Sequence, residues 1–268
     1  MASKYFQTVF KPDLVDGDIS KLIADDKTDA PFTAGDILFD WHAVDVPKGS
    51  KKLINATAYM VGEDGGAQAN KDWFLVFAKG QEDGTAPTTL GEENAAQTGC
   101  FELPSLYVGA CKFEASATGI GTVTGGAFGT MYIANAAGAN GVQFPIVIEG
   151  QPGSGTNVGY DKLYVAAFAA GAFDFSTGVL ATEAVSADAA TDVTVDTVDV
   201  RAAFQPGDIV YVHDVDTALG TVSSVPDATS LILTANNVVA IANDDEFINA
   251  TPITCLLYTS DAADEEDS

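Results

Sequence analysis

From residue 37 onward the chain is built from short runs in which apolar and polar residues alternate. In Ile37–Ala43 the odd positions are apolar or aromatic, and Asp40 and His42 fall between them. A period of two is typical of β-strands with one buried face, whereas an amphipathic helix repeats every three to four residues. No stretch of twelve or more residues combines a helical repeat with helix caps. The pattern therefore predicts an all-β fold.

The first two thirds of this pattern predict a β-sandwich. Residues 53–61 are rich in strand-forming residues and end at the glycine-rich turn Gly62–Gly66, and Trp73–Ala78 reads as the next strand. Further strand-like runs lie at 107–113, 142–149 and 162–168, after a polar loop over 79–99 whose length is typical of a functional or mobile segment. We expect a jelly-roll-like antiparallel sandwich over residues 36–180.

A change in composition predicts a second, smaller domain. Residues 182–191 are small and acidic, so we interpret 181–192 as a linker. Runs of four to six strand-forming residues then alternate with turns such as Pro206-Gly207-Asp208. This spacing predicts a small antiparallel β-barrel over 193–254, truncated at its C-terminal end.

The two ends of the sequence stand apart from these domains. We expect residues 1–35 to form an N-terminal arm, with one or two turns of amphipathic helix over Ile19–Asp26. The segment Cys255–Glu265 looks like the conceptual translation of a transposase-type sequencing adaptor. We therefore expect the natural sequence to stop near Thr254, and residues 255–268 to be an adaptor-derived tail outside the fold.

The charge of the chain excludes several classes of function. It has 38 acidic against 12 basic residues and a net charge of −26, which becomes −21 without the three Asp and two Glu of the tail. Such a chain lacks the cations for nucleic-acid binding and is repelled by anionic membranes. A mean hydropathy of +0.14 excludes charge-driven disorder. With no signal peptide and no membrane span in the sequence, we expect synthesis in the cytoplasm.

Motifs that could carry chemistry are weak. The glycine-rich segment Gly119–Gly129 begins like a phosphate loop, but position 124 is Thr and no helix is expected to follow, so a β-loop is the better interpretation. Gly153-Ser154-Gly155 lacks the spacing of a nucleophile elbow. His42 and His213 have no motif around them. We predict no catalytic residue and no cofactor-binding residue, and therefore a non-enzymatic protein.

Metal sites are not favoured either. Asp214–Thr217 and Asn243–Glu246 carry oxygen ligands suited to calcium, but neither matches a calcium-loop pattern, and carboxylates cluster by chance in an acidic chain. We predict no metal ligands. Cys100 and Cys111 have no zinc-site spacing, and we interpret them as buried free thiols.

Aromatic residues and possible modification sites have two interpretations each. Trp41, Trp73, Phe74 and Phe77 could form a sugar-binding platform, but aromatic residues at alternate strand positions more often belong to the core. The acceptor patterns for N-glycosylation at Asn55 and Asn249 occur without a secretory signal, so we interpret them as chance.

Two parts of the chain resemble structural proteins of marine tailed phages, cyanophages among them. The first is Phe39–Gly49 followed by Lys52–Ala58, and the second is Phe204–Val212 with Gly220–Val225. The resemblance implies a virion component on the capsid surface, such as a decoration protein. Its implied partners are further copies of itself in a homo-oligomer and the major capsid protein or other virion proteins. Because no long spine helix is expected, the major capsid protein itself is a weaker interpretation.

Two other classes of function stay open. A receptor- or glycan-binding module, as in a tail fibre or surface adhesin, predicts an exposed aromatic shelf beside polar groups. An enzyme such as a polysaccharide depolymerase predicts a deep pocket lined by carboxyl groups with perturbed pKa values. A decoration protein predicts large interfaces between subunits and symmetric assembly.

Overall fold

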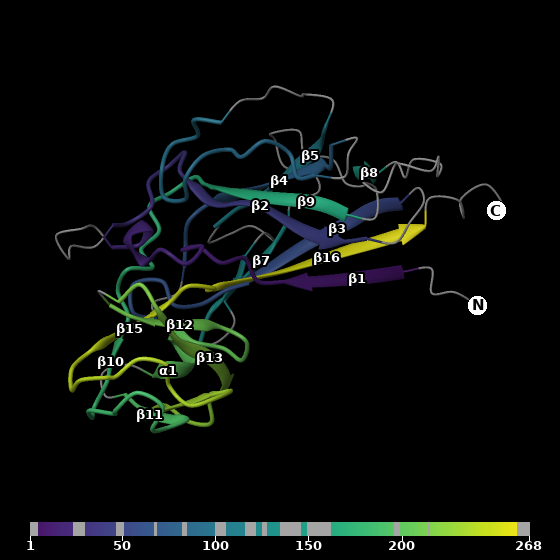
Figure 1. Ribbon diagram of the computed structural model, residues 1–268. Helices are drawn as coiled ribbons and strands as arrows, with labels where there is room; N and C mark the ends of the chain where they lie inside the picture. Colours follow the sequence, from purple (N-terminus) through teal and green to yellow (C-terminus); the bar gives the residue numbers. More distant parts are fainter. Residues whose placement is uncertain are drawn as a thin grey trace.

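The computed structural model consists of a large and a small β-lobe (Figure 1). It describes residues 5–23, 30–46, 51–66, 69–81, 85–99, 106–115, 122–124, 128–134, 146–148, 162–195, 199–213 and 215–261. Within these residues there are sixteen strands, one four-residue α-helix and one 3-10 helix. The prediction of an all-β fold with sandwich and barrel architecture is confirmed.

The large lobe is a sandwich whose first sheet contains both ends of the described chain. Its strands lie in the order β1-β16-β3-β7-β6, and β8 also pairs with β3. All the pairings are antiparallel. The strands are β1 (Tyr5–Phe10), β3 (Lys51–Met60), β6 (Thr122–Thr124), β7 (Thr130–Ile133), β8 (Ile146–Ile148) and β16 (Ile253–Asp261).

The second sheet of the sandwich has the order β2-β9-β4-β5 and is also antiparallel. Its strands are β2 (Ile37–Asp45), β4 (Trp73–Lys79), β5 (Tyr107–Phe113) and β9 (Lys162–Ala169). Alternate side chains of the two sheets meet in one core, where Trp73 packs on Phe113 and Tyr132. Large aromatic side chains thus fill the space between the sheets.

The small lobe is a six-stranded antiparallel sheet in the order β10-β15-β12-β13-β14-β11. A β-bridge between Ala181 and Val195 brings the two end strands together, so the sheet curls toward a closed barrel around its own hydrophobic cluster. The elements are β10 (Val179–Leu180), β11 (Asp192–Thr194), α1 (Val200–Ala203), β12 (Ile209–Val212), β13 (Ala218–Ser224), β14 (Ser230–Leu233) and β15 (Glu246–Asn249).

The domain boundaries differ from those expected. The barrel begins at β10, and the expected linker 181–192 lies inside it: Thr182 donates its N–H to Thr194 O, and Val185 exchanges backbone hydrogen bonds with Ile241. Small acidic residues occupy the connections of this barrel because its strands are very short, which made them look like a linker. The barrel ends at β15, so it is an insertion in the sandwich.

The segment expected to be an adaptor-derived tail supplies a central strand of the sandwich. β16 pairs along its whole length with β3 on one side and, over Cys255–Ser260, with β1 on the other. Its alternate residues Cys255, Leu257 and Thr259 are buried. The exclusion of residues 255–261 from the fold was therefore wrong for this chain, because resemblance to an adaptor says nothing about how well a segment can form a strand. Residues 262–268 lie outside the described residues.

The expected N-terminal arm is also part of the sandwich. Strand β1 lies at the edge of the first sheet, and Leu14 donates its N–H to Ala250 O at 2.8 Å. The apolar positions that predicted an amphipathic helix are all buried, but the helix formed is the 3-10 helix η1 (Ile19–Lys21), capped by Asp18. Non-local pairing with β16, 250 residues away, holds the segment in place.

A buried polar cluster joins the two lobes. Lys11 follows β1, and its Nζ lies 2.5 Å from Oδ1 of Asp208, whose side chain is 1 % exposed at the start of β12. Asn249 donates from Nδ2 to Asp208 Oδ2 and to Ala203 O, at 2.7 and 2.8 Å. Because a buried carboxylate is costly unless it is paired, this cluster favours one orientation of the small lobe.

Candidate functional site

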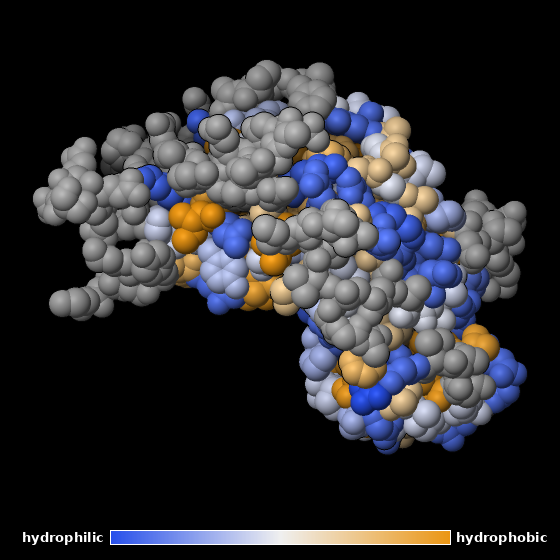
Figure 2. All heavy atoms as spheres, turned by 180° about the vertical axis from the view of Figure 1, so that it is seen from behind, coloured by the Kyte–Doolittle hydropathy of each residue, from blue (hydrophilic) through white to orange (hydrophobic). Residues whose placement is uncertain are grey.

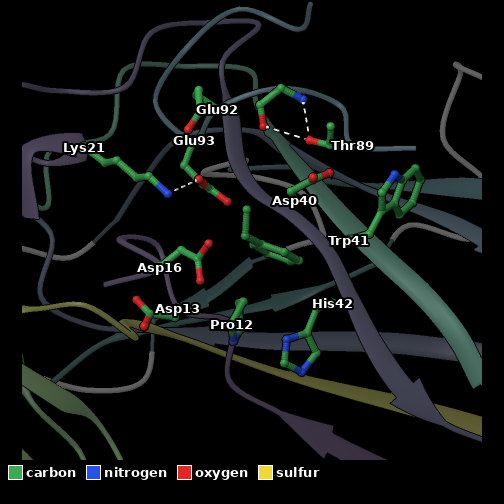
Figure 3. A pocket seen from close by; sticks show the side chains of 12 residues that line it. Pro12, Asp13, Asp16, Lys21, Asp40, Trp41, His42, Thr89, Glu92 and Glu93 are labelled. Atoms are coloured by element: carbon green, nitrogen blue, oxygen red, sulfur yellow. Dashed lines mark hydrogen bonds and ion pairs between the residues drawn. The ribbon is translucent and has the colours of Figure 1, made fainter. Parts of the chain in front are cut away.

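A pocket of about 330 Å³ opens beside strand β2 of the sandwich (Figure 3). Three segments far apart in the sequence supply its walls, and most of its lining side chains are charged or aromatic. The residues are Pro12, Asp13, Asp16, Lys21, Phe39, Asp40, Trp41, His42, Thr89, Gly91, Glu92 and Glu93. The pocket lies within the range of volumes that small-molecule sites have.

The first wall is an irregular part of β2. The pairing of β2 with β9 shifts register between Ile37 and Phe39 and again between Phe39 and His42. The predicted alternation is therefore broken: Leu38 and Phe39 both lie in the sandwich core, while Asp40, Trp41 and His42 are all half-buried. Such irregularities redirect side chains, and here they turn three consecutive ones toward the pocket.

The second wall is the loop 85–99, which folds over the outer face of the same sheet. Its Leu90 packs with Ile37 and Ala166, and Leu90 N–H donates to Asp40 Oδ1 at 3.1 Å. The Trp41 indole N–H donates to Thr88 O at 2.9 Å. This part of the loop predicted to be functional or mobile is thus fixed by hydrogen bonds and lines the pocket. Residues 82–84 lie outside the described residues.

The third wall is the segment after β1. Asp13 accepts a hydrogen bond from Val15 N–H at 3.0 Å, and Asp16 adopts a left-handed backbone with φ of 45°. Lys21 reaches across to the loop, where its Nζ lies 2.6 Å from Glu93 Oε2. In Figure 3 this ion pair lies along one side of the pocket, opposite Trp41 and His42.

The pocket carries an excess of negative charge, with five carboxyl groups against one lysine. Burial raises the pKa of Asp13 and lowers the pKa of His42. Burial also disfavours the ammonium form of Lys21, but the hydrogen bond and the charge of Glu93 outweigh it and raise the pKa of Lys21. The pocket thus offers hydrogen-bond acceptors beside neutral aromatic rings.

This arrangement suits a ligand with several hydrogen-bond donors and an apolar face. Carboxylates accept hydrogen bonds from hydroxyl or amino groups, and an indole face packs on apolar C–H groups. Within the described residues no three His, Cys, Asp or Glu side chains are grouped so that they could hold a metal ion. Among the described residues, neither a serine nor a cysteine lines the pocket.

The four aromatic residues weighed as a platform or as core fall into two groups. Trp73 and Phe77 are fully buried in the sandwich core, as the core interpretation predicts. Trp41 is half-buried at the pocket, where its ring lies 5.8 Å from that of Tyr107. Phe74 is half-buried elsewhere, under Lys112. The structure therefore leaves Trp41 alone of the four at the candidate site.

Two carboxylates of the acidic turns considered for calcium accept hydrogen bonds from backbone N–H groups. Asp245 accepts a hydrogen bond from Ala242 N–H at 2.6 Å, and Glu246 accepts one from Gly178 N–H at 2.7 Å. Asp216 is exposed, and Asp214 lies outside the described residues. His213 follows β12 and is not among the described residues that line the pocket.

The remaining sequence signals have simple positions. Cys111 is buried and free, as predicted, and burial raises its pKa; Cys100 and most of the glycine-rich segment 119–129 lie outside the described residues. Asn249 is 4 % exposed and bonded within the lobe junction, which is incompatible with a glycan there. Asn55 is half-buried and bonds to Ala56 N–H.

Sequence reasoning missed most of the pocket. Glu93 belongs to no motif in the sequence, yet its side chain is only 9 % exposed and is paired with Lys21. Asp13, Asp16 and Lys21 carried no motif. The only available signal was their spacing around the buried positions 14, 15 and 19, which marks a segment held against the core.

Comparisons with known proteins assign no family. No family model matches the chain, and no curated protein matches it. Among solved structures, a chain from the atomic structure of Sulfolobus turreted icosahedral virus is similar over 96 % of this chain and 90 % of that chain, at 14 % identity and a TM-score of 0.13. A likeness this low carries no argument. Within the described residues, no helix is long and apolar enough to cross a membrane.

Proposed function

We propose that this chain is a structural component of a tailed-phage particle, an outward-facing capsid decoration protein that acts through subunit contacts. The observation that carries the proposal is an acid-free outer face on the first sheet of the sandwich. Over residues 6–10 of β1, 253–260 of β16, 52–60 of β3 and 130–133 of β7 no side chain is acidic, and the one charged side chain is that of Lys52. The whole chain, by contrast, has 38 acids.

The strand register shows how continuous this face is. Val9, Leu256, Thr57 and Ile133 form one row across four strands, and Thr254, Tyr59 and Met131 form another. Val9 is 57 % exposed and Met131 is 42 % exposed. The cores of protein interfaces are depleted of charged residues, so such a face is suited to a protein contact.

The distribution of charge also supports the proposed placement of the first sheet against the capsid shell. A second body can approach the acid-free face without meeting the repulsion that the rest of this acidic chain would impose. The proposed occupant is the outer, uncharged surface of the capsid shell, with the acidic small lobe directed into solvent. Figure 2 shows that lobe projecting from the sandwich, with isolated hydrophobic residues among hydrophilic ones. Packaged DNA would repel the chain from the inside of the shell.

The test is binding to capsids of the encoding phage from which surface proteins have been removed. We expect the wild-type chain to bind with a fixed copy number per shell subunit. Val9→Glu and Met131→Glu should abolish binding, because each buries a charge in the contact, while thermal stability stays unchanged. Val238→Glu is the matched control: Val238 is 55 % exposed on the small lobe, and the variant should bind like the wild type.

Two results would contradict the proposal. One is a wild-type chain that does not bind the shell at any concentration tested. The other is binding that Val9→Glu, Met131→Glu and Val238→Glu leave equally intact, which would place the contact elsewhere.

The pocket favours a second candidate function, a glycan- or receptor-binding module of a tail fibre or adhesin. The specific observation is Trp41, a half-buried indole between carboxylates and a preformed loop. Sugar hydroxyl groups would donate to Asp40 and Glu92, and a sugar C–H face would pack on the indole.

A glycan array separates the two functions. If the second function holds, the wild-type chain gives specific hits, and Trp41→Ala lowers their affinity by ten-fold or more, as the loss of about 1.4 kcal/mol would. Phe74→Ala is the control, because Phe74 is also half-buried on the second sheet but lies outside the pocket. An array without hits, together with capsid binding, would reject this second function.

A further inference from the structure

Glu63 is a deeply buried carboxyl group with few polar partners among the described residues. It lies in the turn after β3, and its side chain is 2 % exposed. Oε1 contacts only Nζ of Lys71, and Oε2 has no hydrogen-bond partner among the described residues. Buried polar groups in native proteins are nearly always satisfied, so an unsatisfied one calls for a specific explanation.

The contact that Glu63 does make is with the amine of Lys71. Nζ of Lys71 forms an ion pair with Oε1 of Glu63, and the same Nζ lies 5.8 Å from the centre of the Phe173 ring. Burial lowers the pKa of Lys71, and the charge of Asp174 only partly opposes this. Burial of the pair therefore makes a neutral amine beside a neutral acid less costly, relative to the ion pair, than it is in water, and only the neutral amine is a nucleophile.

The surroundings hold this pair in place and exclude water from its carboxyl side. Phe173 stacks on Phe175, and both rings are buried. Asp64 and Gly65, which follow Glu63, donate their N–H groups to Asp174 O and Thr177 O at 2.7 and 3.2 Å. Pre-positioning of two reacting groups can replace most of the entropic cost of a reaction between them.

We propose that Glu63 and Lys71 condense to an intramolecular amide bond that links Cδ of Glu63 to Nζ of Lys71. The ion pair first transfers one proton from the ammonium group to the carboxylate, giving a neutral amine and a neutral acid. The amine lone pair attacks Cδ, and the C–OH bond then breaks. The hydroxyl leaves with the second amine proton as one water, so neither an oxidant nor any other reagent is needed.

The product explains the unsatisfied carboxylate. An amide carries no charge, so the cost of burying the ion disappears with the bond that forms. The water product can leave along the Lys71 side chain, which is 37 % exposed. The bond would also cross-link the connection between β3 and β4. In this connection Gly62 donates its N–H to Ala202 O of the small lobe.

Intact mass spectrometry of the purified, folded wild-type chain tests the proposal. We expect a mass lower than that of the sequence by one water, and a digest that contains a branched peptide joining Glu63 to Lys71. Lys71→Arg should show the full mass of its sequence, because a guanidinium is not a nucleophile at neutral pH. Glu63→Gln should lose ammonia in place of water if its amide carbon is attacked in the same way.

A second ion pair serves as the control. Lys21 and Glu93 are also close, at 2.6 Å, and their side chains are 13 % and 9 % exposed. Lys21→Arg should keep the loss of one water, which would assign the loss to Lys71. A wild-type chain that keeps its full sequence mass, both freshly folded and after prolonged incubation, would overturn the proposal, and so would a loss of water that persists in Lys71→Arg.

Discussion

The sandwich and the small lobe build similar antiparallel sheets but use the chain in opposite ways. In the small lobe, β12, β13 and β14 follow one another in sequence and pair as neighbours. In the sandwich, β1 pairs with β16, so Tyr5 lies opposite Ser260. The barrel is therefore a contiguous insertion with its own hydrophobic cluster, whereas the sandwich is complete only when both ends of the described chain have returned to it.

This difference separates two sources of stability. Local pairing costs little chain entropy, so the small lobe can form from residues 179–249 alone. Non-local pairing closes a loop of almost the entire chain before any contact is gained. The sandwich should therefore be the lobe that depends on the chain termini, and the experiments below test this order from the largest expected effect to the smallest.

Removal of β16 should have the largest effect. A chain ending at Thr254 loses Cys255 and Leu257 from the core and leaves β1 and β3 without the strand between them. We expect the sandwich amides to lose their protection from hydrogen exchange, while those of β12 to β14 keep theirs. A chain ending at Asp261 is the control and should behave like the full chain. Equal loss of protection in both lobes would show that they fold as one unit.

The same contrast explains what the sequence could predict. Short strands joined by tight turns, such as Ile209–Val212 and Ser230–Leu233, were recognisable because the pattern and the turn lie in one window. The apolar run Cys255–Tyr258 is also typical of a buried strand, but it was set aside on account of its resemblance to an adaptor. Local patterns thus identify a strand without revealing the partner beside it.

The pocket was less predictable than the fold. Its position depends on register shifts within β2, and no alternation pattern announces a shift of register. The pocket also depends on Leu90 and Asn94 of a polar loop. Asn94 donates from Nδ2 to Lys21 O and to Ala30 O, both at 2.6 Å. Such hydrogen bonds join segments about 70 residues apart, so sequence spacing cannot reveal them.

Truncation of one core leucine in each lobe should sharpen the comparison. Leu231 in the small lobe and Leu257 in the sandwich are both buried, and replacing either by Ala should cost about 2–5 kcal/mol. We expect Leu231→Ala to lower protection in the barrel alone and Leu257→Ala to lower it in the sandwich. Val238→Ala, at an exposed position, should change stability by less than about 0.5 kcal/mol. Identical exchange profiles for the two leucine variants would contradict the separation.

A smaller effect is expected at the junction of the lobes. Lys11→Met leaves buried Asp208 without its cation and should cost about 1–3 kcal/mol in chemical denaturation. Burial raises the pKa of Asp208, so its protonated form is favoured in the folded state. The cost should therefore be smallest below the ordinary pKa of 3.8 and grow as the pH rises through the raised value. Lys11→Met/Asp208→Asn should recover part of the loss; a double variant as unstable as Lys11→Met would refute the role of the ion pair.

The smallest expected effect concerns His42, where the sandwich meets the pocket. Its ring stacks on Phe10 at 5.0 Å, and burial lowers its pKa from 6.5, although several pocket carboxyl groups would act in the opposite direction. The unfolded chain therefore takes up a proton before the folded chain does, and stability should fall as the pH drops below about 6.5. His42→Gln should flatten this dependence between pH 7 and 5 in denaturant titrations. An NMR titration that places the His42 pKa above 6.5 would contradict this prediction. It would show that the charges of the pocket carboxylates affect His42 more strongly than its burial does.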